Sequence, residues 1–161
     1  MEQFRLLTSD DVEEYHEVLV SGYAAHKDYP ISFDAIEFDF EKSVEWVKNH
    51  PVYGLFVDGK LVCSITFRMP WEPDATPMGY PHIAHFVTAP EEKGKGYARK
   101  TLAYAEDKLV NVFKTRFVTL GTASEHPWLK DMYVSFGFKE FGYKHFPGKQ
   151  HTTTFFEKQL Y

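Results

Sequence analysis

Cysteine is nearly absent from the chain, and long apolar runs are missing. Cys63 is the one cysteine among 161 residues, which excludes a disulfide within the chain and favours a reducing compartment. No run approaches the roughly 18 apolar residues of a membrane-spanning helix. The opening stretch MEQFRLLTSDDVEEY also lacks the cationic segment and apolar run of a secretory signal. We therefore expect a cytoplasmic protein that does not enter a membrane.

Positive charge is in the minority. Lys and Arg number 18 against 23 Asp and Glu, so the formal net charge is −5 at pH 7. Proteins that bind nucleic acid or anionic membrane surfaces depend mainly on an excess of positive charge. Neither partner is expected here, and a cationic partner would be attracted more easily.

Linkers, repeats and low-complexity tracts are missing as well. Hydrophobic residues make up 43% of the chain and aromatic residues 17%, which is enough for one well-filled core. Nothing marks a boundary between two folding units. We predict a single domain that spans residues 1–161.

The patterns that are present alternate between strand and helix, which indicates an α/β fold. Asp58–Gly59 separates two β-rich runs, as in a hairpin with a type I′ turn. Cys63 alternates with apolar neighbours in the second run, which predicts a core residue and not a nucleophile. Apolar residues at helical spacing predict three further features of the chain. The first is a helix that Thr8 or Ser9 caps. The second begins at Asp39 or Phe40 and has Phe40, Val44 and Val47 on its apolar face. The third begins near Gly96 and has on its apolar face Ala98, Leu102, Ala105, Leu109 and Val112.

A glycine-rich loop joins the run HIAHFVTAP to the helix that begins near Gly96. Its sequence, EEKGKGYARKTL, covers residues 91–102. A strand that leads through glycines into a helix presents backbone N–H groups and the positive helix end together, which predicts an anion site. The P-loop and the dinucleotide fingerprint both fail on spacing, because Arg99 stands where each requires a small residue.

This loop resembles the diphosphate-binding loop of the GNAT superfamily of acyl-CoA-dependent N-acyltransferases. The matching stretch is Lys93-Gly94-Lys95-Gly96-Tyr97-Ala98, and MYVSFGF, which ends at Phe138, resembles the family's second signature. The resemblance implies a single-domain fold with a central mixed, mostly antiparallel sheet of six or seven strands and about four helices. It also implies direct transfer of an acetyl group from acetyl-CoA to a primary amine in a ternary complex. Dimers are common in this superfamily.

The resemblance also implies which residues hold the acyl carrier. Backbone N–H groups of the strand would bind the acyl carbonyl and the pantetheine arm, and the loop would bind the diphosphate. Lys93 stands where the family usually has Gln or Arg, and His126 lies near where many members have Asn. The implied carrier-binding residues are Phe86, Val87, Thr88, Lys93, Gly94, Lys95, Gly96, Tyr97, Ala98, Arg99 and His126.

Two side chains are candidates for the chemistry. His82 falls at the strand position similar to the family's catalytic Glu, and imidazole has an ordinary pKa of about 6.5, which suits a general base. His85 or a water molecule alone is the alternative. Tyr133 matches the family's helical tyrosine, which donates a proton or a hydrogen bond to the departing thiolate. His82 and His85 are three residues apart and would face opposite sides of a regular strand, which argues against a shared metal site, so no metal is expected.

The acceptor site is predicted between residues 22–37 and the connection of the last two strands. Its acidic and aromatic residues would receive a small-molecule or peptide amine, including a cationic one. The alternatives are an acyl-CoA-binding sensor of the same fold that does not turn over, and a structural protein in which the glycine loop is only a loop. The residues proposed for the acceptor are Tyr23, Asp28, Tyr29, Phe33 and Glu37.

Overall fold

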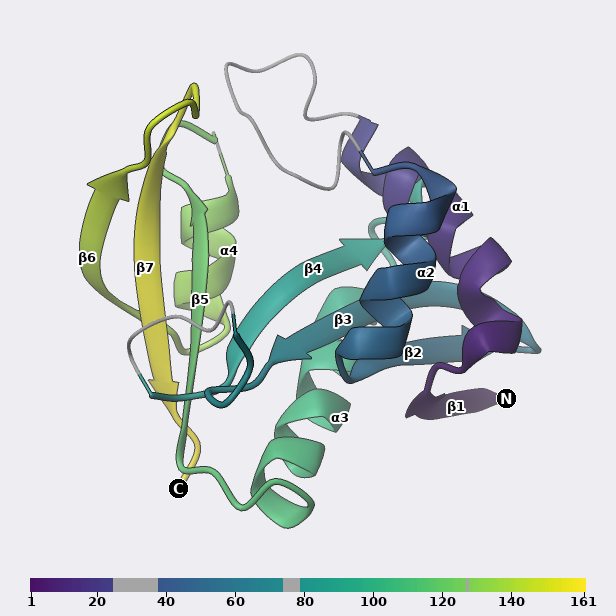
Figure 1. The fold of residues 1–161 in the computed structure, drawn as a ribbon. Coiled ribbons are helices and arrows are strands. Elements are labelled where there is room, and N and C mark those ends of the chain that lie inside the picture. Colours follow the sequence, from purple (N-terminus) through teal and green to yellow (C-terminus); the bar gives the residue numbers. More distant parts are fainter. Residues whose placement is uncertain (25–37, 74–78, 127) are drawn as a thin grey trace.

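The fold is a seven-stranded sheet between two pairs of helices (Figure 1). The computed structural model describes residues 1–24, 38–73, 79–126 and 128–161. The strand order is β1-β2-β3-β4-β5-β7-β6, and β4–β5 is the parallel pair in an otherwise antiparallel sheet. The described strands are β1 (Glu2–Leu6), β2 (Val52–Val57), β3 (Lys60–Arg68), β4 (His82–Thr88), β5 (Phe117–Ala123), β6 (Lys139–His145) and β7 (Thr152–Gln159).

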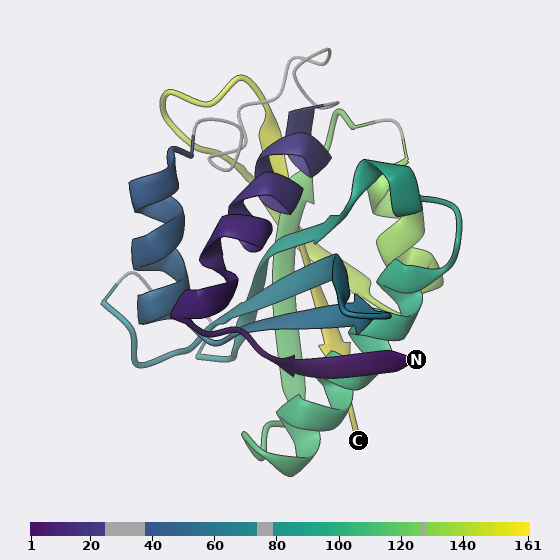
Figure 2. The same cartoon turned by 90° about the vertical axis from the view of Figure 1, so that its right-hand side faces the viewer.

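The helices lie on both faces of the sheet, as the rotated view shows (Figure 2), and the buried core forms a cluster on each face. One cluster of buried apolar residues joins α1 and α2 to the sheet, and another joins α3 and α4 to it. The predicted mixed α/β fold is confirmed. None of the helices in the described ranges is long and apolar enough to cross a membrane. The helices are η1 (Ser9–Asp11), α1 (Val12–Ala24), α2 (Phe40–Asn49), η4 (Pro90–Glu92), α3 (Tyr97–Asn111) and α4 (Leu129–Ser135).

Local signals place the turns and helix starts where the sequence predicts them. Asp58 (φ 50°) and Gly59 (φ 83°) both adopt the left-handed backbone of a type I′ turn. The Thr8 side chain accepts a hydrogen bond from the N–H of Asp10 and belongs to a capping box. Asp39 caps α2 by accepting from the N–H of Lys42 at 2.8 Å.

The predicted apolar faces of two helices are wrong in part. In α2, Phe40 and Val44 are exposed, whereas Val47 and the polar Ser43 are buried. The Ser43 hydroxyl lies 2.7 Å from Nδ1 of His16 on α1, so this helix contact is partly polar. Val112 is exposed because α3 ends at Asn111, before its last predicted turn.

Two irregularities of β4 shape the middle of the sheet. Its pairing with β5 covers two positions, His82 opposite Thr119 and Ile83 opposite Leu120, so the strands separate beyond Ile83. On its other edge, Ser64 of β3 pairs with Val87 while Thr66 pairs with Ala84, so one residue of β3 faces two of β4. This is a β-bulge, a feature that bends a strand and redirects its side chains.

Candidate functional site

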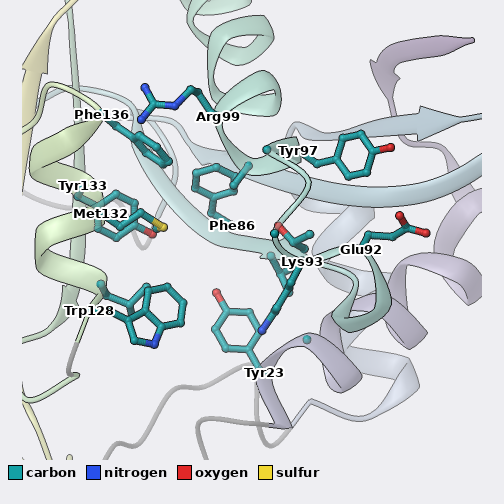
Figure 3. Close-up of a pocket in the computed structure, with 17 residues that line it drawn as sticks. Tyr23, Phe86, Glu92, Lys93, Tyr97, Arg99, Trp128, Met132, Tyr133 and Phe136 are labelled. Atoms are coloured by element: carbon teal, nitrogen blue, oxygen red, sulfur yellow. The ribbon is translucent and has the colours of Figure 1, made fainter.

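A cavity of about 430 Å³ opens beside the glycine loop, and we call it the loop cavity. Helix α4 forms one wall, and the end of α1 with the glycine loop forms the other, as Figure 3 shows. Phe86 of β4 lies between these walls. Most residues predicted to bind the acyl carrier line it. Its described lining comprises Gly22, Tyr23, Phe86, Val87, Thr88, Glu92, Lys93, Gly94, Gly96, Tyr97, Ala98, Arg99, Trp128, Leu129, Met132, Tyr133 and Phe136.

The glycines of the loop are required by backbone conformation. Gly94 and Gly96 have φ of 83° and 82°, a region that residues with a Cβ adopt at a cost. A Cβ at either position would meet nothing within 4 Å, so space is not the constraint. Gly96 is also the N-cap of α3, where no side chain caps the helix and no acidic residue lies in the first turn. The positive end of the helix dipole is therefore available to an anion at this loop.

The cationic side chains near the loop differ in where they point. Lys93 and Arg99 line the loop cavity. The Arg99 guanidinium lies 4.8 Å from the centroid of the Phe136 ring. Lys95 is not among the lining residues, and its Nζ lies 2.8 Å from a Glu92 carboxylate oxygen. The structure thus brings Lys93 and Arg99 to the cavity but does not bring Lys95 there.

Helix α4 supplies the aromatic wall. Trp128, Met132 and Phe136 follow one another at intervals of four residues, a helical spacing that is visible in the sequence. Tyr133 lies beside them and is almost wholly buried. Its burial raises the pKa of the phenol above its ordinary value of 10, so the hydroxyl keeps its proton at neutral pH.

A second cavity, of about 250 Å³, adjoins the first, and we call it the histidine cavity. Tyr23, Phe86, Leu129 and Tyr133 line both cavities. The two therefore meet near the point where β4 and β5 separate. The described residues that line the histidine cavity alone are Trp46, Arg68, His82, Ile83, Ala84, His85, Leu120, Gly121 and Thr122.

His82 is fixed in the histidine cavity by Thr119. Its Nδ1 lies 2.8 Å from Oγ1 of Thr119, and that hydroxyl is 3.4 Å from the carbonyl oxygen of Pro81. If the hydroxyl donates to Pro81, it accepts from Nδ1–H and leaves Nε2 of His82 as a proton acceptor. Burial, with a smaller contribution from the positive charge of Arg68, lowers the pKa of His82 to about 4. The imidazole is therefore neutral at physiological pH, with a pKa below the ordinary value assumed from the sequence.

His85 lines the same cavity as His82, so the prediction that the two face opposite sides is wrong. The physical reason is the bulge in β4, where His85 adopts a φ of 46° and its side chain leaves the regular alternation. The His85 ring stacks on Trp46 at 4.0 Å and meets the edge of Phe38 at 4.9 Å. Among the described residues no group of three or more His, Cys, Asp or Glu side chains could hold a metal ion.

His126 lines neither cavity, although it was predicted to contact the carrier. It is buried, and its ring packs edge-on against Trp128 at 4.7 Å. The backbone N–H of Trp128 donates to Nδ1 of His126 at 3.4 Å. Burial and the charge of Lys93 lower the pKa of His126. The structure gives it contacts that hold Trp128 in the wall of the loop cavity.

Three other predictions concern the surroundings of the cavities. Cys63 is a buried core residue, as predicted, and burial raises the pKa of its thiol to about 11. Tyr23, which was proposed for the acceptor site, lines both cavities. Residues 25–37, which contain the other proposed acceptor residues Asp28, Tyr29, Phe33 and Glu37, lie outside the described residues.

Sequence reasoning did not identify Arg68 and Trp46, which come from the end of β3 and from α2. Neither belongs to a recognisable motif, and they are 22 positions apart in the sequence. The signal available was the basic residue that ends a strand of alternating apolar residues, LVCSITFR. The indole of Trp46 stacks on His85 of β4, and it lines the same cavity as the Arg68 guanidinium.

Comparison with known proteins gives a consistent family. A sequence model described as the acetyltransferase (GNAT) family matches residues 12–138. The chain is 33% identical over 159 residues to S-(2-succino)cysteine N-acetyltransferase of Bacillus subtilis (strain 168), covering 98% of this chain and 96% of that protein. It is 37% identical over 138 residues to S-alkylcysteine N-acetyltransferase of the same organism, covering 84% of this chain and 78% of that protein.

Solved structures resemble the fold at low sequence identity. The ribosomal-protein-S18-alanine N-acetyltransferase from Escherichia coli superposes with a TM-score of 0.76 at 12% identity, covering 99% of this chain and 94% of the other. The PaiA N-acetyltransferase from Thermoplasma acidophilum in complex with coenzyme A gives 0.74 at 17% identity, covering 99% of each chain. At such identity the likeness concerns the fold alone.

Proposed function

The chain belongs to the acetyltransferase (GNAT) family and is an N-acetyltransferase, and from this premise we propose that its acceptor is the α-amine of an S-substituted cysteine. The observation that carries the proposal is the meeting of two cavities at Tyr133 and Phe86. One cavity contains the glycine loop, which suits an anionic carrier, and the other is a separate pocket of the size of a small amine. The two Bacillus relatives, named for cysteine derivatives, supply the chemical class of that amine.

Acetyl-CoA would occupy the loop cavity with its diphosphate at the glycine loop. The N–H groups at Gly94 and Gly96, the start of α3, Lys93 and Arg99 are the groups that suit an anion. The pantetheine arm would follow β4 at Phe86, Val87 and Thr88, where β5 has separated and leaves the strand edge accessible. This arrangement brings the thioester to the residues that both cavities share.

The acceptor would enter the histidine cavity with its amine toward the thioester. As the C–N bond forms, the nitrogen becomes more acidic, and Nε2 of neutral His82 takes its proton. The C–S bond then breaks and the thiolate leaves. Trp46 and His85, whose rings stack on each other, both line the cavity, and an S-alkyl group can pack against them.

Tyr133 is placed to act on the sulfur because it lines both cavities. A buried phenol with a raised pKa is a weaker acid than a thiol, whose ordinary pKa is about 8.5. Its contribution is therefore a hydrogen bond that stabilises the departing thiolate, and complete proton transfer is less favourable.

The test is thiol release from acetyl-CoA with a panel of acceptors. We expect S-methylcysteine and S-(2-succino)cysteine to exceed spermidine and an N-terminal alanyl peptide by about 100-fold in kcat/KM, because a site built around polar groups rejects ligands that leave them unsatisfied. His82→Gln should lower kcat/KM about 100-fold, the usual contribution of a general base, with acetyl-CoA binding retained. A higher rate with spermidine or the peptide would overturn the proposed acceptor. Stabilisation by acetyl-CoA without thiol release from any acceptor would favour the binding-module alternative.

A further inference from the structure

We propose that Arg68 binds the carboxylate of the acceptor and thereby makes the enzyme selective for amino acids over amines that lack an acid group. The inference rests on the proposed function and identifies the side chain that would bind the acceptor's carboxylate. It begins from the position of Arg68 at the end of β3, where it pairs with His82 of β4 and lines the histidine cavity.

The pairing with His82 matches the spacing of an α-amino acid. In such an acceptor a single carbon separates the amine from the carboxylate. Side chains of residues directly opposite each other on adjacent antiparallel strands have Cβ atoms about 5 Å apart. An acceptor whose amine faces the imidazole of His82 would therefore bring its carboxylate within reach of the neighbouring guanidinium. The planar guanidinium can donate two parallel N–H bonds to one carboxylate, which fixes orientation as well as position.

The charge of the cavity agrees with an anionic group. Arg68 is the one Lys or Arg side chain among the described residues that line the histidine cavity, and that part of the lining contains no Asp or Glu. The positive charge of Arg68 contributes to the lowered pKa of His82, which lines the same cavity. A polyamine acceptor would meet a like charge there, whereas a carboxylate would be attracted to it.

The experiment compares two acceptors that differ by the carboxylate alone, S-methylcysteine and 2-(methylthio)ethylamine, with wild type, Arg68→Gln and Arg68→Lys. In wild type we expect kcat/KM to be about 100-fold higher for the acid, the scale of one desolvated charged pair. Arg68→Gln should lower kcat/KM for the acid about 100-fold and should lower it much less for the decarboxylated amine, which has no carboxylate to lose its partner. Arg68→Lys should recover part of the loss, since it keeps the charge but not the fork of donors.

Arg116→Gln is the matched control, because it removes the same charge from an exposed position that lines neither cavity. The rise in melting temperature with acetyl-CoA shows whether each variant is folded, and binding of N-acetyl-S-methylcysteine in the presence of CoA gives a readout that does not depend on turnover. Equal losses for both acceptors, or no loss, would overturn this inference while wild-type turnover of the cysteines still supports the proposed function. If Arg68→Gln does not fold, equal use of both acceptors by wild type overturns it. If wild type acetylates only amines without a carboxylate, both this inference and the proposed function are overturned.

Discussion

At the scale of single residues, protonation in the buried site is set by desolvation. Tyr133 is buried and His82 is partly buried, and desolvation holds each in its neutral form, the imidazole by a lowered pKa and the phenol by a raised one. The sequence identified both residues through the family resemblance, but it could give only their ordinary pKa values. Arg68, which adds to the shift of His82, belongs to no motif and becomes visible only when β3 and β4 are paired.

We predict that His82 makes the free energy of unfolding depend on pH. Its pKa is about 4 in the folded protein and near 6.5 in the unfolded chain, so the unfolded chain binds more protons between these values. The stability that the neutral imidazole allows is complete above pH 6.5 and is lost as the pH falls from 6.5 to about 4. In urea unfolding, the free energy of unfolding of wild type relative to that of His82→Gln should fall by on the order of 3 kcal/mol between pH 7 and pH 4. His145→Gln, at an exposed strand position, is the control. Parallel curves for wild type and His82→Gln would contradict the assignment.

We predict that Tyr133→Phe separates chemistry from binding. The variant keeps the ring that packs against Phe136 and Phe138 and removes only the hydroxyl. The kcat value should fall about 100-fold, because a preorganised donor to the leaving sulfur is lost. The KM for acetyl-CoA and the melting temperature should stay close to those of wild type. A kcat within twofold of wild type would show that the hydroxyl takes no part in the reaction.

At the scale of elements, local sequence signals give the ends of the helices and the hairpin, but they do not give the irregularities that build the site. The type I′ turn at Asp58–Gly59 and the cap at Asp39 depend on neighbouring residues, so they could be predicted. The bulge at His85 depends on how β3 and β4 match in register, which is a property of two strands together. That is why the directions of His82 and His85 were predicted wrongly while the strand itself was found.

The contact between α1 and β4 offers a prediction at this scale. A Cβ on Gly22 would overlap with Cγ2 of Val87 and would lie 3.1 Å from the carbonyl oxygen of Thr88. Gly22→Ala should therefore push α1 away from β4. It should reduce the free energy of unfolding by about 1–3 kcal/mol and weaken acetyl-CoA binding. Gly142→Ala is the matched control, since a Cβ there meets nothing within 4 Å. Adding Val87→Ala to Gly22→Ala should restore much of the stability that Gly22→Ala loses. Unchanged stability in Gly22→Ala would disprove the tight contact.

At the scale of the whole molecule, the net charge of −5 hides a local cationic site. The composition argues against a general affinity for polyanions, but it cannot show that Lys93 and Arg99 converge on one cavity while Lys95 is held by Glu92. The sheet order also escapes sequence analysis, since β7 lies between β5 and β6 and the neighbours in space are not neighbours in the chain. The family resemblance predicted the class of fold, whereas the candidate site became visible only from the pairing of the strands.

We predict that acetyl-CoA stabilises the whole domain and that Lys93 contributes to this effect. At a concentration about 100 times its Kd the ligand adds about 2.7 kcal/mol, which raises Tm by roughly 5–10 °C for a chain of this length. Lys93→Gln should reduce the rise in Tm at a fixed acetyl-CoA concentration, because it removes a cation that lines the loop cavity. Lys95→Gln should leave it unchanged, because Lys95 is paired with Glu92 outside the lining. Equal effects of the two substitutions would show that the loop acts through total charge alone.

The shared wall of the two cavities has a consequence for how such an enzyme diversifies. Four side chains serve both compartments, while Trp46 and Arg68 belong to the histidine cavity alone. With the acceptor in the histidine cavity, as we propose, mutations at α2 and at the end of β3 would change the choice of acceptor and leave the loop cavity intact. Gene copies that drift at these few positions would acquire new amine preferences while they inherit the acetyl-CoA apparatus intact.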